Sequence, residues 1–226
     1  MSILIRTDGL SFYVPTSSGN VEIKALSTKQ VSLEAEIKAL KKEYELSDKV
    51  KVIIFTDKSV VVPTELYISD NARLYFELKG IDIDFEQDYI VSSQNELCTY
   101  FWLCIRQVID VINANFDEVV YIHILELAQL FGERLSLKFN SNVFLISKEG
   151  DMLSLTVFQK NTMVFHEIFE VNSPSDTIFY IKAILVKYAF RNSDNLVVIG
   201  ENNESLTKIL LNFSKTVSEI EYFETI

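Results

Sequence analysis

The fold is indicated by two related segments, Leu10-Ser11-Phe12-Tyr13-Val14 and Leu153-Ser154-Leu155-Thr156-Val157. Two further pairs follow at a similar separation, Val21-Glu22-Ile23 with His166-Glu167-Ile168, and Ser47-Asp48 with Ser193-Asp194. The separations are 143, 145 and 146 residues, so the spacing drifts by only three. We therefore expect one folding pattern to occur twice, with a cleft between two similar lobes.

Length and composition favour a folded protein with a large core. Of its 226 residues, 48% are hydrophobic, which suits one large domain or two small lobes. The net charge is −11, from 21 basic and 32 acidic residues. Binding to a nucleic-acid backbone relies on clustered Lys and Arg, so this acidic chain is not expected to bind nucleic acid. Lys38, Lys41 and Lys42 alternate with Glu at helical spacing, which indicates a solvated helix face.

Neither a metal site, a disulfide framework nor a membrane span is predicted. Cys98 and Cys104 fall in a stretch expected to be helical, where a spacing of six places them on different faces, and no His cluster accompanies them. The longest apolar run, 97–105, is nine residues long, whereas a membrane-spanning helix needs about 20. No apolar signal-peptide region follows the first residues. We expect a cytoplasmic location.

The first half of the chain predicts the order strand, strand, strand, helix, strand. Alternation and β-branched residues indicate strands at 3–6, 10–14 and 21–26. Apolar residues at helical spacing indicate a helix at 32–46, followed by a buried strand at 51–55. The next expected elements are a helix at 69–78, a strand at 89–91, a long helix at 95–113 with a broad apolar stripe, a strand at 119–124 and a helix at 125–135.

The second half repeats this order. Strands are expected at 143–147, 153–158, 163–171, 196–199 and 219–223, with helices beginning near Ser173-Pro174 and covering 204–213. Ser173 suits the N-cap and Pro174 the first helical position. No low-complexity linker separates the halves, so we place the boundary at 142. The expected units are 1–142, with a helical insertion, and 143–226.

Several short motifs suggest a family. They are 7–12 (TDGLSF), 62–66 (VPTEL), 121–123 (YIH), 165–169 (FHEIF), 173–176 (SPSD) and 179–180 (FY). With the repeated strand and helix order, they resemble an uncharacterised bacterial family grouped with actin-like ATPases and compared with pilus-assembly and cell-division proteins. The resemblance implies an α/β fold of two ribonuclease-H-like lobes in tandem, an actin-like ATPase architecture with an interlobe cleft. Actin, sugar kinases and Hsp70 chaperones use such lobes in pairs.

The same resemblance implies a nucleotide site. In such folds ATP and Mg²⁺ lie between the lobes, with phosphates held by backbone N–H groups of two hairpins and adenosine by a Gly-rich loop. The residues at these positions are Asp8, Gly9 and Ser11 in the first hairpin, Glu149, Gly150 and Asp151 in the second, and Gly200 and Asn202 at the adenosine loop.

The sequence departs from the family pattern at each of these positions. The Asp8-Gly9-Leu10-Ser11 hairpin is out of register by one residue, and single glycines stand where pairs or triplets are expected. With six glycines in the chain, few positions let backbone approach phosphate without a Cβ clash. Glu149, Asp151 and Glu201 would also repel a triphosphate unless Mg²⁺ intervened. We therefore expect a degenerate nucleotide site.

Each candidate residue also has an ordinary structural explanation. Asp8 is either a carboxylate that positions magnesium or a turn residue before Gly9, and 149–151 divides in the same way. His123 and His166 alternate with apolar neighbours, so we expect hydrogen-bonded structural histidines rather than a catalytic or metal site.

Three functions stay open. We favour a non-catalytic actin-like module that binds an unidentified protein partner. The alternative is a divergent actin-like ATPase in which Asp8, Ser11 and 149–151 bind Mg²⁺-nucleotide. A ribonuclease-H-type enzyme needs several carboxylates converging on two metals, and Asp8 has no recognisable companions. No nucleophile motif is present, so the sequence leaves open whether the protein is an enzyme and what its oligomeric state is.

Overall fold

The computed structural model describes residues 1–6, 9–15, 21–27, 32–44, 48–68, 71–95, 98–200, 204–214 and 217–220. The chain divides into two compact units, Met1–His123 and Ile124–Ile226, and each is described by itself. The sequence places the boundary at 142 instead. The difference arises from helix α4 (Ile124–Phe139), which packs on strands of the second unit.

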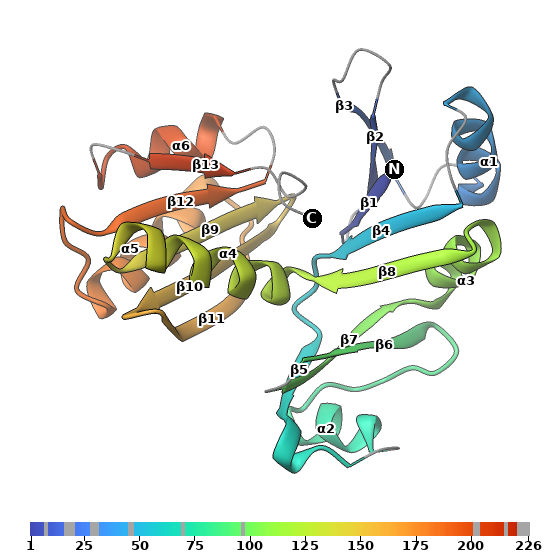
Figure 1. Ribbon diagram of the computed structural model, residues 1–226, viewed down its shortest axis with the longest axis horizontal. Helices are drawn as coiled ribbons and strands as arrows, with labels where there is room; N and C mark the ends of the chain where they lie inside the picture. The colour runs from blue at the N-terminus through green and yellow to red at the C-terminus, as the bar shows by residue number, and fades with distance from the viewer. Residues whose placement is uncertain are drawn as a thin grey trace. The chain divides into compact units, whose positions relative to one another are not determined.

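The first unit is built on a five-stranded sheet with the order β3-β2-β1-β4-β8 (Figure 1). Its strands are β1 (Ser2–Ile5), β2 (Gly9–Pro15), β3 (Val21–Ser27), β4 (Lys49–Ile54) and β8 (Glu118–His123). The first three form the expected antiparallel meander, while β4 and β8 run parallel to β1. Helices α1 (Leu33–Glu43) and α3 (Arg106–Asn115) lie side by side.

A small antiparallel sheet is inserted between β4 and α3. It has the order β5-β7-β6, from β5 (Ser59–Pro63), β6 (Asp88–Gln94) and β7 (Cys98–Ile105). The short 3-10 helix η1 (Thr64–Leu66) and helix α2 (Ala72–Leu78) connect β5 to β6. Val62, Phe76, Phe101 and Leu103 form the buried core of this insertion.

The long helix expected at 95–113 is wrong in its first part. Residues 98–105 form strand β7, and α3 begins at Arg106 with no residue between them. A short apolar run cannot be assigned to a helix or a strand from periodicity alone. Here β7 is the central strand of the small sheet, and every residue from Thr99 to Cys104 is buried. The apolar helical stripe expected over 98–112 therefore does not exist.

The strand also places the two cysteines on one face, whereas a helix would place them on different faces. Six residues apart on one strand, Cys98 and Cys104 lie on the same face, about 20 Å from each other. Both are free thiols. Burial, and then the charge of Asp88, raises the pKa of the Cys104 thiol, which makes it a poor nucleophile.

The second unit has a five-stranded sheet with the order β11-β10-β9-β12-β13. Its strands are β9 (Val143–Glu149), β10 (Met152–Gln159), β11 (Thr162–Glu170), β12 (Asn195–Ile199) and β13 (Val217–Ile220). Residues 221–223 of the last expected strand lie outside the described residues. As in the first unit, three antiparallel strands are followed by two that run parallel to the first of them.

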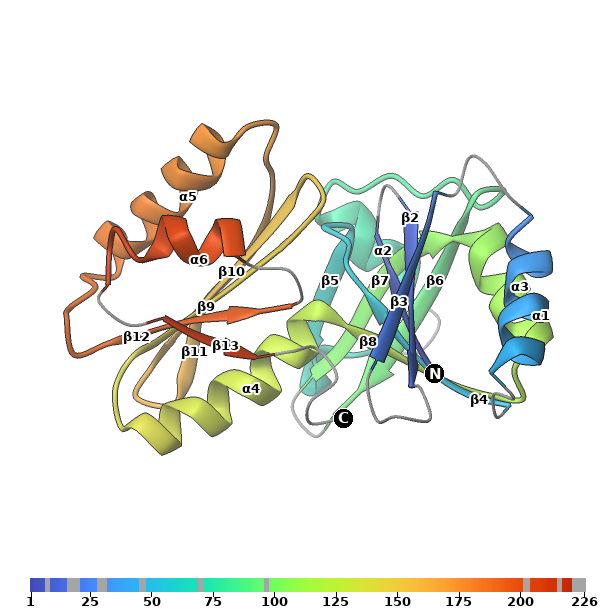
Figure 2. The same ribbon diagram turned by 90° about the horizontal axis from the view of Figure 1, so that it is seen from above.

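Helices cover both faces of the second sheet. Figure 2 shows α4 on one face and α5 (Pro174–Lys187) with α6 (Glu204–Leu210) on the other. The predicted start of α5 is confirmed, because the Asp176 N–H donates to the Ser173 hydroxyl at 3.2 Å and Pro174 occupies the first turn. Within the described ranges, no helix combines the length and apolar character needed to cross a membrane.

The repeated sequence segments occupy equivalent strands. Residues 10–14 lie in β2 and 153–157 in β10, which are the second strands of the two meanders. Residues 21–23 and 166–168 lie in the third strands, β3 and β11. Each pair therefore has the same place in its own sheet.

His123 ties together three parts of the first unit. It ends β8, and its Nε2 donates to the carbonyl oxygen of Thr56 at 2.9 Å, since a carbonyl can only accept. Its ring stacks on Trp102 of β7 with 5.4 Å between centroids. The expected hydrogen-bonded histidine is confirmed here, and His166 Nδ1 likewise lies 2.8 Å from the Thr156 hydroxyl. Burial lowers the pKa of His123 to about 4.

We expect acid to destabilise the first unit through His123. Its folded pKa of about 4 lies below the usual 6.5, so the unfolded chain binds more protons between these values. The free energy of unfolding should fall by up to about 3 kcal/mol as pH falls through this window. Urea unfolding followed by fluorescence of Trp102, the single tryptophan, measures it.

His123→Gln should remove most of this pH dependence, because its amide does not titrate. His166→Gln, which removes the other histidine of the chain, is the matched control. Equal pH dependence in His123→Gln and wild type would contradict the assignment.

Gly132 of α4 is required by close packing on β10. A Cβ at this position would lie 2.0 Å from Cε2 of Phe158, a fully buried side chain. Gly132→Ala should therefore destabilise the second unit by about 1–3 kcal/mol, despite the better helix propensity of Ala. Thermal unfolding monitored by circular dichroism measures the change. In a Phe158→Leu background the same substitution should cost less, and a stabilising Gly132→Ala would contradict the packing argument.

Candidate functional site

Two hairpins carry most of the residues that the sequence assigns to a nucleotide site. In the first, Ile5 pairs with Leu10, and the Arg6 N–H donates to the Gly9 carbonyl at 2.9 Å. In the second, Glu149 pairs with Met152, so Gly150 and Asp151 form a two-residue turn. Asp8 lies outside the described residues.

The first hairpin is closed by its own side chains. Ser11 lies in β2 between Leu4 of β1 and Ala25 of β3, and it is only 4% exposed. Nη1 of Arg6 donates to its hydroxyl oxygen at 2.7 Å. Hydrogen bonds with a charged partner are stronger than neutral ones. The Ser11 oxygen is thus engaged within the chain, while Gly9 begins β2 opposite Ser27.

The second hairpin is a compact turn. Gly150 has φ of 59°, which fits the first position of a two-residue turn where glycine is preferred. The Lys148 ammonium donates to the Gly150 carbonyl, and the Asp151 carbonyl accepts from the Val171 N–H at 2.6 Å. This hairpin therefore offers one glycine, with the nearby Lys148 cation directed to the turn itself.

The adenosine position is described only in part. Gly200 follows β12, is buried, and has φ of 126°, a conformation that favours glycine. Asn202 and its neighbours at 201 and 203 lie outside the described residues. Helix α6 resumes the described chain at Glu204.

Parallel pairing places some of these residues at one edge of the second sheet. Strands β9 and β12 are parallel neighbours, with Ile146 opposite Val198. Their carboxyl ends therefore meet, and the turn at Gly150 and Asp151 lies at the same edge as Gly200. In open α/β sheets, the carboxyl ends of strands are where ligands bind. Gly9 and Ser11 belong to the equivalent hairpin of the other unit.

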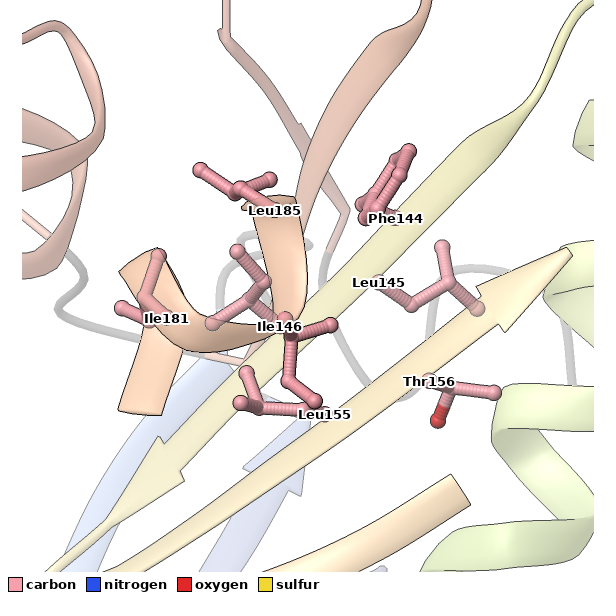
Figure 3. A pocket seen from close by; sticks show the side chains of 8 residues that line it. Phe144, Leu145, Ile146, Leu155, Thr156, Ile181 and Leu185 are labelled. Atoms are coloured by element: carbon pink, nitrogen blue, oxygen red, sulfur yellow. The ribbon is translucent and has the colours of Figure 1, made fainter. Parts of the chain in front are cut away.

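A metal ion needs several ligating side chains in one place. Among the described residues, no three His, Cys, Asp or Glu side chains are grouped in a way that could hold one. A cavity under α5 in the second unit has a volume of about 10 Å³ (Figure 3). Its lining is apolar apart from Thr156, and it comes from β9, β10 and α5. A space of about one water molecule does not suit a nucleotide.

Sequence reasoning missed two cations at the hairpins. Arg6 and Lys148 each precede a turn, yet neither was assigned a role. In the sequence, Arg6 stands five positions before Ser11 and Lys148 two positions before Gly150. Only the pairing of the strands shows which atoms these side chains contact.

Known structures share this fold. One is the crystal structure of a protein from Bacteroides thetaiotaomicron VPI-5482 with an actin-like ATPase fold and unknown function. Its sequence is 20% identical to this chain, the match covers 97% of this chain and 89% of that chain, and the TM-score is 0.72. A chain of the PilM-PilN type IV pilus biogenesis complex is 11% identical, with 99% and 88% covered and a TM-score of 0.61. The comparison with curated proteins finds no match. The chain thus has a mixed α/β, actin-like fold.

A family model agrees with this result. The model described as "Protein of unknown function (DUF3822)" matches residues 1–217. The sequence resemblance to an uncharacterised family with an actin-like fold is therefore confirmed. This chain belongs to the DUF3822 family of proteins of unknown function.

Proposed function

We propose that the chain consists of two ribonuclease-H-like lobes in tandem that arose by internal duplication. The support is the shared strand order of the two five-stranded sheets and the repeated sequence segments in equivalent strands. The lobes would correspond to Met1–His123, with the small sheet as an insertion, and Ile124–Ile226. An interlobe cleft follows from the same proposal.

We further propose that the protein is a non-catalytic module that acts by binding another protein, with a degenerate nucleotide site. The observation that carries this proposal is the Arg6 to Ser11 hydrogen bond, which engages a buried hydroxyl that a phosphate-binding hairpin would present to its ligand. The second hairpin adds support, because a single glycine and the engaged Lys148 leave little to cradle phosphate.

A role in protein binding is compatible with the fold. One structural neighbour is a chain of a complex of two proteins, PilM and PilN. Actin-like folds host several activities, so the function must be argued from the site of this chain. The alternative is a divergent actin-like ATPase that binds Mg-ATP between the two lobes through Asp8, Asp151 and their hairpins.

Saturating ATP with Mg²⁺ should leave the thermal midpoint of the protein unchanged. A ligand at about 100 times its Kd stabilises a folded protein by about 2.7 kcal/mol, which corresponds to about 5–10 °C for a chain of this size. Differential scanning fluorimetry with ATP, ADP and Mg²⁺ alone tests this. A nucleotide-specific rise that Asp8→Asn or Asp151→Asn abolishes, in variants that remain folded, would overturn the proposal and support the ATPase.

The Arg6 to Ser11 bond should behave as a structural interaction. Arg6→Met and Ser11→Ala should each lower the free energy of unfolding. In a double-mutant cycle we expect a coupling of about 1 kcal/mol, because the bond joins a charged donor to a buried hydroxyl. Urea unfolding of the four proteins measures it. A coupling of zero would mean that Ser11 is not held by Arg6, and would remove the main support for a closed hairpin.

A further inference from the structure

Helix α5 has apolar residues on two opposite sides. One side faces the second sheet through Thr177, Ile181, Ile184 and Leu185, which are buried. The opposite side carries Phe179 and Val186, whose exposed fractions are 65% and 73%. A helix that covers one face of a sheet needs a single apolar stripe, so the second one is not explained by the core.

The exposed residues form one continuous strip. Phe179, Ala183 and Val186 follow the spacing i, i+4, i+7 and therefore share one helix face. At 100° per residue, Lys182 falls on one flank of the strip and Lys187 on the other. Neither ammonium has a carboxylate partner among the described residues. Lys187 Nζ instead lies 5.2 Å from the ring centroids of Phe165 and Tyr188.

Aromatic contacts hold this face in place. The Phe179 ring packs edge-on against Tyr180, with 5.4 Å between centroids and 73° between planes. Tyr180 stacks on Phe169 of β11 at 4.3 Å. The two rings above which Lys187 lies restrict its ammonium in the same way. A surface whose side chains are already ordered loses less conformational entropy when it binds.

We propose that this α5 face, made of Phe179, Lys182, Ala183, Val186 and Lys187, docks an acidic amphipathic helix of the partner protein. The inference rests on the proposed function and names its class of partner. Apolar side chains of the partner would cover Phe179 and Val186, and Asp or Glu on both flanks would meet Lys182 and Lys187.

The two lysines of the α5 face favour an acidic helix over a second copy of the chain, a nucleic acid or a membrane. Packing the same face of a second copy against it would bring two pairs of lysines into one interface, and like charges at an interface disfavour association. Two lysines on a chain of net charge −11 are also few for a nucleic acid or an anionic membrane. An acidic helix satisfies the apolar strip and both cations at once.

Two synthetic peptides test the proposal with the full-length chain. The first is a fluorescent, helix-stapled peptide with Leu at i, i+4 and i+7 and Glu on both flanks, and the second has Lys in place of every Glu. Fluorescence anisotropy should show the acidic peptide binding about tenfold or more tightly than the basic one. The double variant Lys182→Glu/Lys187→Glu should reverse this preference. Phe179→Ala should lower the affinity for the acidic peptide by about tenfold.

The matched control lies on α4, which covers the other face of the sheet (Figure 2). Leu137, 67% exposed, and the neighbouring Lys138 offer the same chemistry. Leu137→Ala/Lys138→Glu should leave both affinities unchanged. All substituted side chains are exposed, so the variants should fold, as the thermal midpoint will verify.

Several results would overturn the proposal. Equal affinity for the two peptides would do so, as would binding of the acidic peptide that Phe179→Ala leaves unchanged. A dimer in sedimentation equilibrium that Val186→Glu dissociates would identify a second copy as the occupant. Binding to phosphatidylserine vesicles that the double lysine variant abolishes would identify a membrane. Failure of the broader function looks different. An ATP-specific thermal shift counts against the non-catalytic role, whereas loss of peptide selectivity without such a shift counts against the α5 face alone.

Discussion

Parallel pairing between the first and fourth strands of each sheet determines how the rest is arranged. In the first unit, Ile3, Leu4 and Ile5 of β1 are buried beside β4, and in the second Val143 to Ile146 of β9 are buried beside β12. These strands supply apolar side chains to both faces of their sheets, so helices or further strands must cover each face. The same pairing brings the hairpin after the first strand to the edge where the fourth strand ends.

Much of this could be predicted because strand alternation and helix capping are local signals. The β1 to β3 meander and the Ser173 cap depend on residues close together in the sequence, and they were located correctly. Strand β7 was missed because a run of eight mostly apolar residues has no period that separates a central strand from a buried helix. The unit boundary was also beyond local signals, since α4 joins the second unit through contacts with strands that follow it.

The candidate site divides along similar lines. Which residues occupy the hairpins follows from the repeated segments, but what those residues contact depends on register. In the sequence Ser11 is simply a hairpin residue two positions after Gly9, and only the β1 and β2 pairing shows that Arg6 contacts it. The exposed face of α5 was hidden for another reason. Phe179 and Val186 look like core residues in a sequence, and only their exposure in the folded unit distinguishes them from Ile181 and Leu185.

The direct junction of β7 with α3 has a mechanical consequence. Ile105 ends the strand and Arg106 starts the helix, so no loop can absorb a displacement between them. Arg106 strengthens the joint, because its guanidinium donates to the carbonyls of Phe85 and Asp88 at 3.2 and 2.9 Å. The small sheet and α3 are therefore joined without a loop, and α3 also packs on β6 and β7. Deleting the small sheet, or replacing it with another insertion, would therefore require a new start for α3, the helix that lies beside α1.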